Sequence, residues 1–191
     1  MVREIVIDSL RRPRLAARRV LELDLPPDVL LQAAVALGCA ATLLFHVASL
    51  VVPAPAGAEF AAFVRQPLLA TLLNIVQLYA MAALAAWIGQ RFGGVGTVRG
   101  ATAIVILYNA MSVLMLSALV LALLLVPPVG MVLALAFSFW MIWAPANFVA
   151  ELHGFRSALV VFAGVVVTAI GLLFAMGVVL RLLGLAPPEM G

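Results

Sequence analysis

Five long apolar runs dominate this chain and leave little room for a water-soluble fold. A hydrocarbon core about 30 Å thick is crossed by roughly 20 apolar residues in a helix, and each run reaches that length. The runs cover 29–52, 68–88, 101–126, 129–150 and 157–183. They are apolar on every face, whereas transmembrane strands alternate apolar and polar residues over about ten positions. The sequence therefore predicts an all-α membrane protein with five transmembrane helices.

The composition supports lipid as the main solvent of the chain. Of its 191 residues, 66% are hydrophobic and 10% are charged, against about half and about a quarter in soluble domains. A chain this short cannot bury so much apolar surface in one water-soluble core. The net charge of +3 is therefore interpreted relative to a bilayer, and no nucleic-acid partner is expected. The single cysteine, Cys39, excludes a disulfide within the chain.

The arginines predict the orientation of the spans. If the N-terminus is cytoplasmic, nine of the eleven basic residues lie on that side, and only Arg65 and Arg181 lie on the other. Short cytoplasmic loops carry the excess of positive residues in membrane proteins. We therefore expect a cytoplasmic segment over 1–28, a transmembrane domain over 29–183 and a short tail outside the cytoplasm over 184–191.

The stretch "DSLRRPRLAARRVLELDLPPDV", residues 8–29, predicts an amphipathic helix ahead of the first span. At 100° per residue, Leu10 to Asp24 places most apolar side chains in one arc and the arginines in the opposite arc. Pro13 suits the first turn of such a helix. This pattern is typical of a helix in the membrane interface that faces anionic headgroups. The candidate headgroup contacts are Arg11, Arg12, Arg14, Arg18 and Arg19.

Two other interpretations of this stretch are open. A secretory signal has an apolar core of about 7 to 15 residues, and the run that follows here is longer, although Ala54-Pro55-Ala56 resembles a cleavage site. A nucleic-acid-binding arm has no visible reason to be attached to five spans. The interfacial helix is the favoured interpretation.

A few polar residues lie within the spans, where they are costly and informative. They either form hydrogen bonds between helices or line a polar path of a small transporter or channel between the second and third spans. No span has an acid or arginine in its middle, which argues against a proton pump, a voltage sensor or a charged-substrate carrier. The candidate polar cluster is Thr71, Asn74, Gln77, Tyr108 and Asn109.

No catalytic constellation is visible. The chain lacks a nucleophile elbow, a His-Glu-x-x-His motif and a phosphate-binding loop. With two histidines and one cysteine, none suitably spaced, we expect no metal and no cofactor. The glycine-rich stretch "GQRFGGVGTVRG", Gly89 to Gly100, is interpreted as a flexible turn between two spans.

The loop "ELHGFRS", residues 151–157, is a candidate partner-contact loop through Glu151, His153 and Arg156. As a structural turn, it would use Gly154 as a left-handed helix cap, Ser157 to start the next helix, and an ion pair between Glu151 and Arg156. A third class, a lipid-modifying enzyme, would need the three candidate residues to converge. In the preceding span, we expect Trp140 to pack against another helix.

The stretches "RRPRLAARRVLELDLPPDVLL" and "ELHGFRSALVVFAGVVV" resemble the bacterial branch of the Yip family, named for Rab-interacting members in eukaryotes. The resemblance covers essentially the whole chain and implies a cytoplasmic N-terminus and five closely spaced spans. The Asp-Leu-Tyr-Gly-Pro motif of eukaryotic members is absent, and so is a proline shortly after Tyr108. The resemblance implies a non-enzymatic role in membrane organisation in a bacterial inner membrane. The partners that it implies are membrane lipids and either another membrane protein or a second copy of this chain. In a larger membrane complex, the chain would be an accessory subunit.

Overall fold

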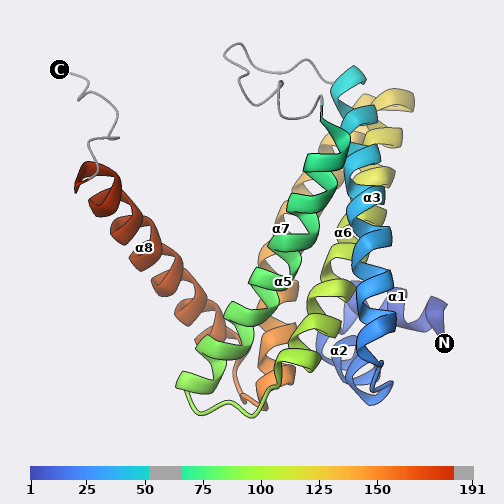
Figure 1. The fold of residues 1–191 in the computed structure, drawn as a ribbon. Helices are drawn as coiled ribbons and strands as arrows, with labels where there is room; N and C mark the ends of the chain where they lie inside the picture. Colours follow the sequence, from blue (N-terminus) through green and yellow to red (C-terminus); the bar gives the residue numbers. More distant parts are fainter. Residues whose placement is uncertain (52–65, 183–191) are drawn as a thin grey trace.

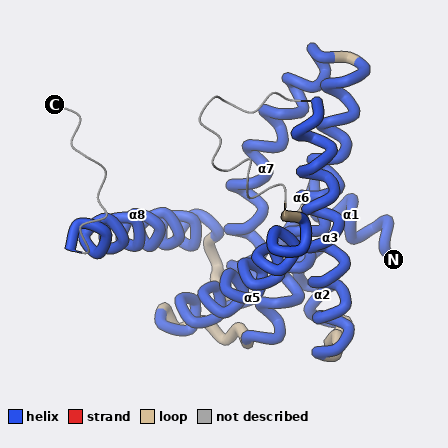
Figure 2. The backbone as a smooth tube through the Cα atoms, turned by 45° about the horizontal axis from the view of Figure 1, so that its top comes forward, coloured by secondary structure: helices blue, strands red, loops and turns tan. Residues whose placement is uncertain are grey.

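The computed structural model describes residues 1–51 and 66–182, and the regular structure in these ranges is entirely helical (Figures 1 and 2). Each predicted apolar run forms a helix whose ends lie within three residues of the predicted bounds. Figure 1 shows α3, α5, α6 and α7 as a bundle from which α8 diverges. The helices are α1 (Val2–Arg11), α2 (Pro13–Glu22), α3 (Pro27–Val51), α5 (Pro67–Arg91), α6 (Val98–Leu125), α7 (Pro127–His153) and α8 (Ala158–Leu182).

Four of these helices, α3, α5, α6 and α7, are long and apolar enough to cross a membrane, counted over the described ranges. The fifth apolar helix, α8, contributes a shorter apolar stretch, Ala158–Thr168. The predicted tail over 184–191 and Arg65 lie outside the described residues. The chain is therefore a helical integral membrane protein with four candidate spans and one further apolar helix.

Local sequence signals place the ends of the helices. Proline stands at the start of α2, α5 and α7, where its missing N–H leaves no hydrogen bond unmade. At the start of α6, the Thr97 hydroxyl accepts from the Gly100 N–H at 3.1 Å. Gly154 ends α7 in the left-handed conformation at φ 71°, and the Ser157 hydroxyl accepts from Val160 N–H at 3.4 Å. The predictions for Gly154 and Ser157 are thus confirmed.

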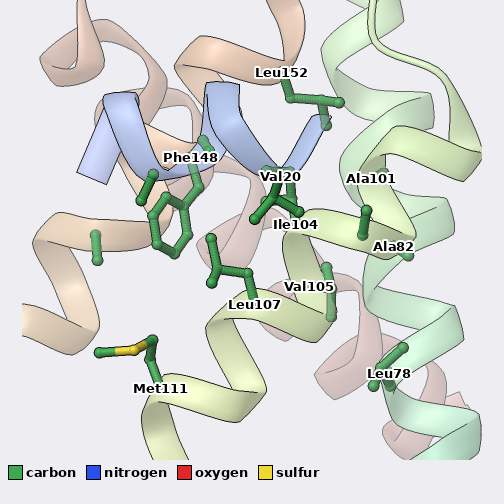
Figure 3. Close-up of a cluster of buried hydrophobic side chains, with 14 of the residues drawn as sticks. Val20, Leu78, Ala82, Ala101, Ile104, Val105, Leu107, Met111, Phe148 and Leu152 are labelled. Atoms are coloured by element: carbon green, nitrogen blue, oxygen red, sulfur yellow. The ribbon is translucent and has the colours of Figure 1, made fainter. Parts of the chain in front are cut away.

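The core is centred on α6, which packs against α2, α3, α5 and α7. Five consecutive residues of α6, Ala101 to Val105, are buried, which shows that neighbours surround this part of the helix. Figure 3 shows Leu78 and Ala82 from α5, Phe148 from α7 and Val20 from α2 around it. Most of this core lies in one half of the bundle, near the starts of α3 and α6 and the ends of α5 and α7.

That half of the bundle is referred to as the arginine end. It holds α1, α2, the loop 92–97 and the turn between α7 and α8, which Figure 1 shows together at the bottom of the molecule. Arg99 binds the α2–α3 turn there, donating to the Asp24 carbonyl at 2.6 Å and the Leu25 carbonyl at 2.9 Å. Nine arginines lie in these segments or at the adjoining ends of α5 and α6: Arg3, Arg11, Arg12, Arg14, Arg18, Arg19, Arg91, Arg99 and Arg156.

The N-terminal segment differs from the single interfacial helix predicted over Leu10 to Asp24. The chain breaks at Arg12, with φ −141° and ψ 64°, because Pro13 cannot continue a helix that began upstream. Two helices result, and α2 ends at Glu22. The predicted apolar arc is present on α2, but it packs against α6 and α7 instead of facing lipid. Its buried residues are Pro13, Ala16, Ala17 and Val20.

Candidate binding site at the arginine end

A tryptophan anchors the N-terminal helices to the bundle. Because Pro13 has no N–H, the Ser9 carbonyl lacks the helical partner it would otherwise have four residues on. The Trp140 Nε1–H of α7 donates to this carbonyl at 2.9 Å in a buried position. The Trp140 ring also stacks on Tyr108 of α6, with centroids 5.6 Å apart. Trp140 therefore packs between helices, as predicted, and holds the α1–α2 junction.

Arginines of α2 then bind acids and carbonyls on both sides. The Arg18 Nε donates to the Glu151 carboxylate at 2.7 Å, and this hydrogen bond raises the pKa of the Arg18 guanidinium. Arg14 donates to the Arg156 carbonyl at 3.1 Å. The predicted pair of Glu151 with Arg156 is wrong, because α2 docks beside the end of α7 and Arg18 takes the carboxylate. Four of the ion pairs at this end thus join residues that are distant in sequence or on different helices.

Arg19 has a different environment from the other predicted headgroup residues. Its guanidinium lies 3.2 Å from the carboxylates of both Glu4 and Asp8 on α1. This contact holds α1 against α2. Arg19 therefore stabilises the packing of α1 against α2 within the N-terminal segment.

The other four predicted headgroup residues surround one pocket, here called the arginine pocket. It has a volume of about 360 Å³ and lies between the α1–α2 junction and α7. No acid lines it. Across the described ranges, Arg11, Arg12 and Arg14 take part in no ion pair. Its lining residues are Arg11, Arg12, Pro13, Arg14, Leu15, Arg18, Trp143 and Asn147.

The chemistry of the arginine pocket suits a small anionic group. Guanidinium groups bind carboxylate and phosphate through paired, charge-assisted hydrogen bonds. Trp143 supplies an apolar and aromatic wall. The Asn147 amide donates to the Trp143 carbonyl at 2.8 Å, which leaves its side-chain oxygen as an acceptor. The excess of donors and the lack of carboxylates favour a phosphate or a carboxylate as the occupant.

The glycine-rich loop is packed around a histidine, in contrast to the flexible turn predicted for it. The His153 ring is buried, and its Nδ1 accepts from the Gly96 N–H at 3.1 Å. Its Nε2 lies 3.1 Å from the Ala85 carbonyl, so the neutral ring carries its proton on Nε2. A Cβ atom at Gly89, Gly94 or Gly96 would lie closer than 3.0 Å to this ring. These three glycines are referred to as the glycine socket.

The sequence analysis singled out both the glycine-rich stretch and His153, but it did not predict that they are in contact. The glycines and the histidine come from two predicted loops, 89–100 and 151–157, which the predicted topology places on the same side of the membrane. A ring that needs close backbone approach on several sides can be surrounded only by residues without side chains. That pairing of a glycine cluster with a lone histidine is the signal that indicates the contact.

The predicted polar cluster does not come together. The Thr71 hydroxyl and the Asn74 amide each lie 3.1 Å from the Thr42 hydroxyl of α3, and Thr42 was not among the predicted residues. Gln77 is exposed, and the Asn109 amide donates to the Val105 carbonyl of its own helix at 2.8 Å. The contacts of Thr71 and Asn74 with Thr42 form a hydrogen-bonded junction between α3 and α5. They provide no support for a polar path between α5 and α6.

The three residues of the candidate partner loop point to different places. Glu151 pairs with Arg18, and His153 occupies the glycine socket. Arg156 lines a cleft beside α8, at the end next to the α7–α8 turn, which is called the mouth of the cleft here. They do not converge as a catalytic group would. Within residues 1–51 and 66–182, no three His, Cys, Asp or Glu side chains are placed to hold a metal ion.

Comparison with known proteins identifies a family. No curated protein and no solved structure matches the chain. The family of the Yip1 domain matches residues 7–179, which include α2 through most of α8. This family is not a known enzyme family. With the match covering most of its length and apolar helices throughout, the chain is an integral membrane protein that belongs to the Yip1 family.

Proposed function

We propose that the protein is a non-enzymatic membrane protein that organises the surrounding bilayer by holding anionic lipid headgroups in the arginine pocket. The observation that carries this proposal is the convergence of four arginines on one pocket without a lining acid. Two of them, Arg11 and Arg12, are exposed and form no ion pair in the described part of the chain. A headgroup phosphate supplies the missing negative charge.

The proposed topology places this pocket at the cytoplasmic leaflet. Five spans, with α8 as the fifth, put the N-terminus in the cytoplasm and the C-terminus outside it. The gathering of nine arginines at one end of the bundle supports this orientation, because cytoplasmic segments carry the excess of positive residues. In a bacterial inner membrane, that leaflet presents anionic lipids to them. A reporter fused after Gly191 should behave as non-cytoplasmic, and a cytoplasmic readout would contradict the topology.

The position of Trp143 provides a direct assay for the pocket. The full-length protein is reconstituted in nanodiscs of phosphatidylcholine with increasing phosphatidylglycerol, and tryptophan emission is recorded. We expect the emission to shift with anionic lipid, and the shift to disappear in Trp143→Phe. In Arg11→Gln/Arg12→Gln, the phosphatidylglycerol content that gives half of the emission shift should rise about fivefold per arginine. Each arginine contributes about 1 kcal/mol of attraction near an anionic surface.

Arg91→Gln is the matched control, because Arg91 lies over the Trp87 ring at 5.1 Å and does not line the pocket. It should leave the titration unchanged. Equal responses of the two variants, or no response to anionic lipid, would contradict the proposal. Recovery of a stoichiometric protein partner whose binding is lost in Arg11→Gln/Arg12→Gln would instead make this chain an accessory subunit of a complex.

A further inference from the structure

A second cavity lies between α5, the end of α7 and α8, and Figures 1 and 2 show that α8 diverges from the bundle. Its volume is about 860 Å³, within the roughly 300–1,000 Å³ typical of ligand pockets. Its walls come from the last turns of α5, the end of α7 and the first half of α8. This cavity is referred to as the α8 cleft.

The walls of the α8 cleft offer an occupant almost no hydrogen bonds. The Thr168 hydroxyl donates to the Gly164 carbonyl at 2.8 Å, and the Ser157 hydroxyl accepts from the Val160 N–H. The remaining wall residues are aliphatic, aromatic or glycine, apart from Arg156 at the mouth. A polar ligand would lose its hydration here without compensation. The interior therefore suits hydrocarbon.

The bundle itself does not fill this space. A Cβ atom built at Gly164, which lines the cleft, would meet no atom within 4 Å. The main helix partner of α8 is α7, so the α5 side of the cleft stays open to the surroundings. In a membrane, the surroundings at this level are lipid chains.

The mouth of the cleft carries a positive charge without a protein counter-charge. Arg156 is exposed and takes part in none of the ion pairs among the described residues. Glu151, five residues earlier, is bound to Arg18 at 2.7 Å, and no acid lines the cleft. Arg14 binds the Arg156 carbonyl and so adds a second guanidinium next to the mouth.

We propose that the α8 cleft binds one anionic phospholipid, with its acyl chains between α5 and α8 and its phosphate against Arg156. An apolar helix of a second copy would fill the cleft but would leave this arginine without an anion, since Glu151 is already paired. A phospholipid supplies both the hydrocarbon and the negative charge from one molecule. This site shares no lining residue with the arginine pocket, although Arg14 lies next to both, and it does not require Arg11 or Arg12.

Photolabelling of the full-length protein tests the proposal. The protein is reconstituted in phosphatidylcholine nanodiscs with a small amount of phosphatidylglycerol that carries a diazirine in an acyl chain. After irradiation, mass spectrometry of peptides should find the label on cleft residues of α5 and α8, such as Ile88, Ala163 and Val167. The same diazirine on phosphatidylcholine should label these residues about fivefold less, the effect of one arginine near an anionic group.

Variants separate the parts of this proposal. Gly164→Phe fills the cleft and should abolish the cleft label, whereas Gly171→Phe, on the same helix but outside the cleft and with equally open space, should retain it. Arg156→Gln should reduce labelling by phosphatidylglycerol to the level of phosphatidylcholine. Arg11→Gln/Arg12→Gln should leave cleft labelling unchanged, so failure at one site is distinguishable from failure at the other.

Two results would overturn the proposal. One is labelling that is unaffected by Gly164→Phe or equal for the two headgroups in the wild-type protein. The other is efficient disulfide cross-linking between two copies of Gly164→Cys in a Cys39→Ala background, which would show that α8 of a second copy occupies the cleft.

Discussion

Helices α7 and α8 are joined by a turn of four residues, yet they occupy opposite environments. In α7, buried residues recur from Trp140 to His153 and lie on several sides of the helix. In α8, the only buried side chain among the described ones is Val161. Both helices are strongly apolar. In lipid, apolarity does not drive one helix onto another, and close packing and hydrogen bonds decide the outcome. The α7 helix has these contacts through His153, Trp140 and Glu151, and the described side chains of α8 make no equivalent contacts with other helices.

The largest expected effect comes from filling the glycine socket. Gly89→Ala places a Cβ against the His153 ring, which cannot move away without breaking its bonds to Gly96 and Ala85. Overpacking of this kind destabilises by about 1–3 kcal/mol. We expect a clear fall in the thermal midpoint measured in mild detergent. Gly164→Ala, in the open helix α8, should leave the midpoint unchanged.

A second substitution checks the cause. If the collision with the ring is responsible, Gly89→Ala/His153→Ala should be more stable than the sum of the two single changes predicts. Strict additivity would mean that Gly89 matters for another reason and would remove the glycine socket as the explanation for the packing of α7.

Loss of the tryptophan anchor should have the next largest effect. Trp140→Phe keeps an aromatic ring but leaves the Ser9 carbonyl buried without its donor, which costs about 1–3 kcal/mol. The N-terminal helices should become more accessible to protease in detergent, alongside a lower thermal midpoint. Trp87→Phe is the control because the Trp87 side chain is largely exposed, and it should leave protease accessibility unchanged.

The junction between α3 and α5 should respond less. Thr42→Val removes the acceptor of both Thr71 and Asn74, and hydrogen bonds between membrane helices average about 0.6 kcal/mol each. We expect a small fall in the thermal midpoint. Thr168→Val, whose hydroxyl binds only its own helix, should have no effect, and an equal fall would contradict the assignment.

The smallest effect is expected for the ion pair between α2 and α7. The Arg18 side chain is 62% exposed, and surface pairs contribute about 0–1 kcal/mol. A double-mutant cycle with Arg18→Gln and Glu151→Gln should give a coupling within that range that falls with added salt. A coupling insensitive to salt would indicate that the pair is shielded and contributes more to docking than its exposure implies.

Prediction from sequence succeeded where the cause is local. Long apolar runs, prolines at helix starts and Gly154 after α7 each act within a few residues, and the helices begin and end close to the predicted positions. The grouping of the arginines at one end also follows from the order of the spans. The contacts of the candidate site depend instead on which helix faces which.

The failures illustrate this dependence. The periodicity of α2 identified its apolar face but could not distinguish protein from lipid as the partner, because both are apolar. Arg156 is five residues from Glu151 in sequence, but the carboxylate binds Arg18, which is 133 residues away in sequence. The glycine cluster and the lone histidine were both visible in the sequence, but glycines carry no side chain that specifies which ring they enclose. Each of these outcomes required the three-dimensional arrangement of α2, α5 and α7.

The anchor of the N-terminal helices also dictates the order of events during synthesis. The donor to Ser9 is Trp140, 131 residues further along the chain, and the carboxylate that binds Arg18 is 133 residues away. Helices α1 and α2 therefore wait for α7 before these two contacts can form. Until then, α6 can cover only part of their apolar face, and the rest is left to the bilayer surface. A ribosome stalled before Trp140 should carry an N-terminal segment that remains accessible to protease or bound to lipid, and translation through α7 should close it.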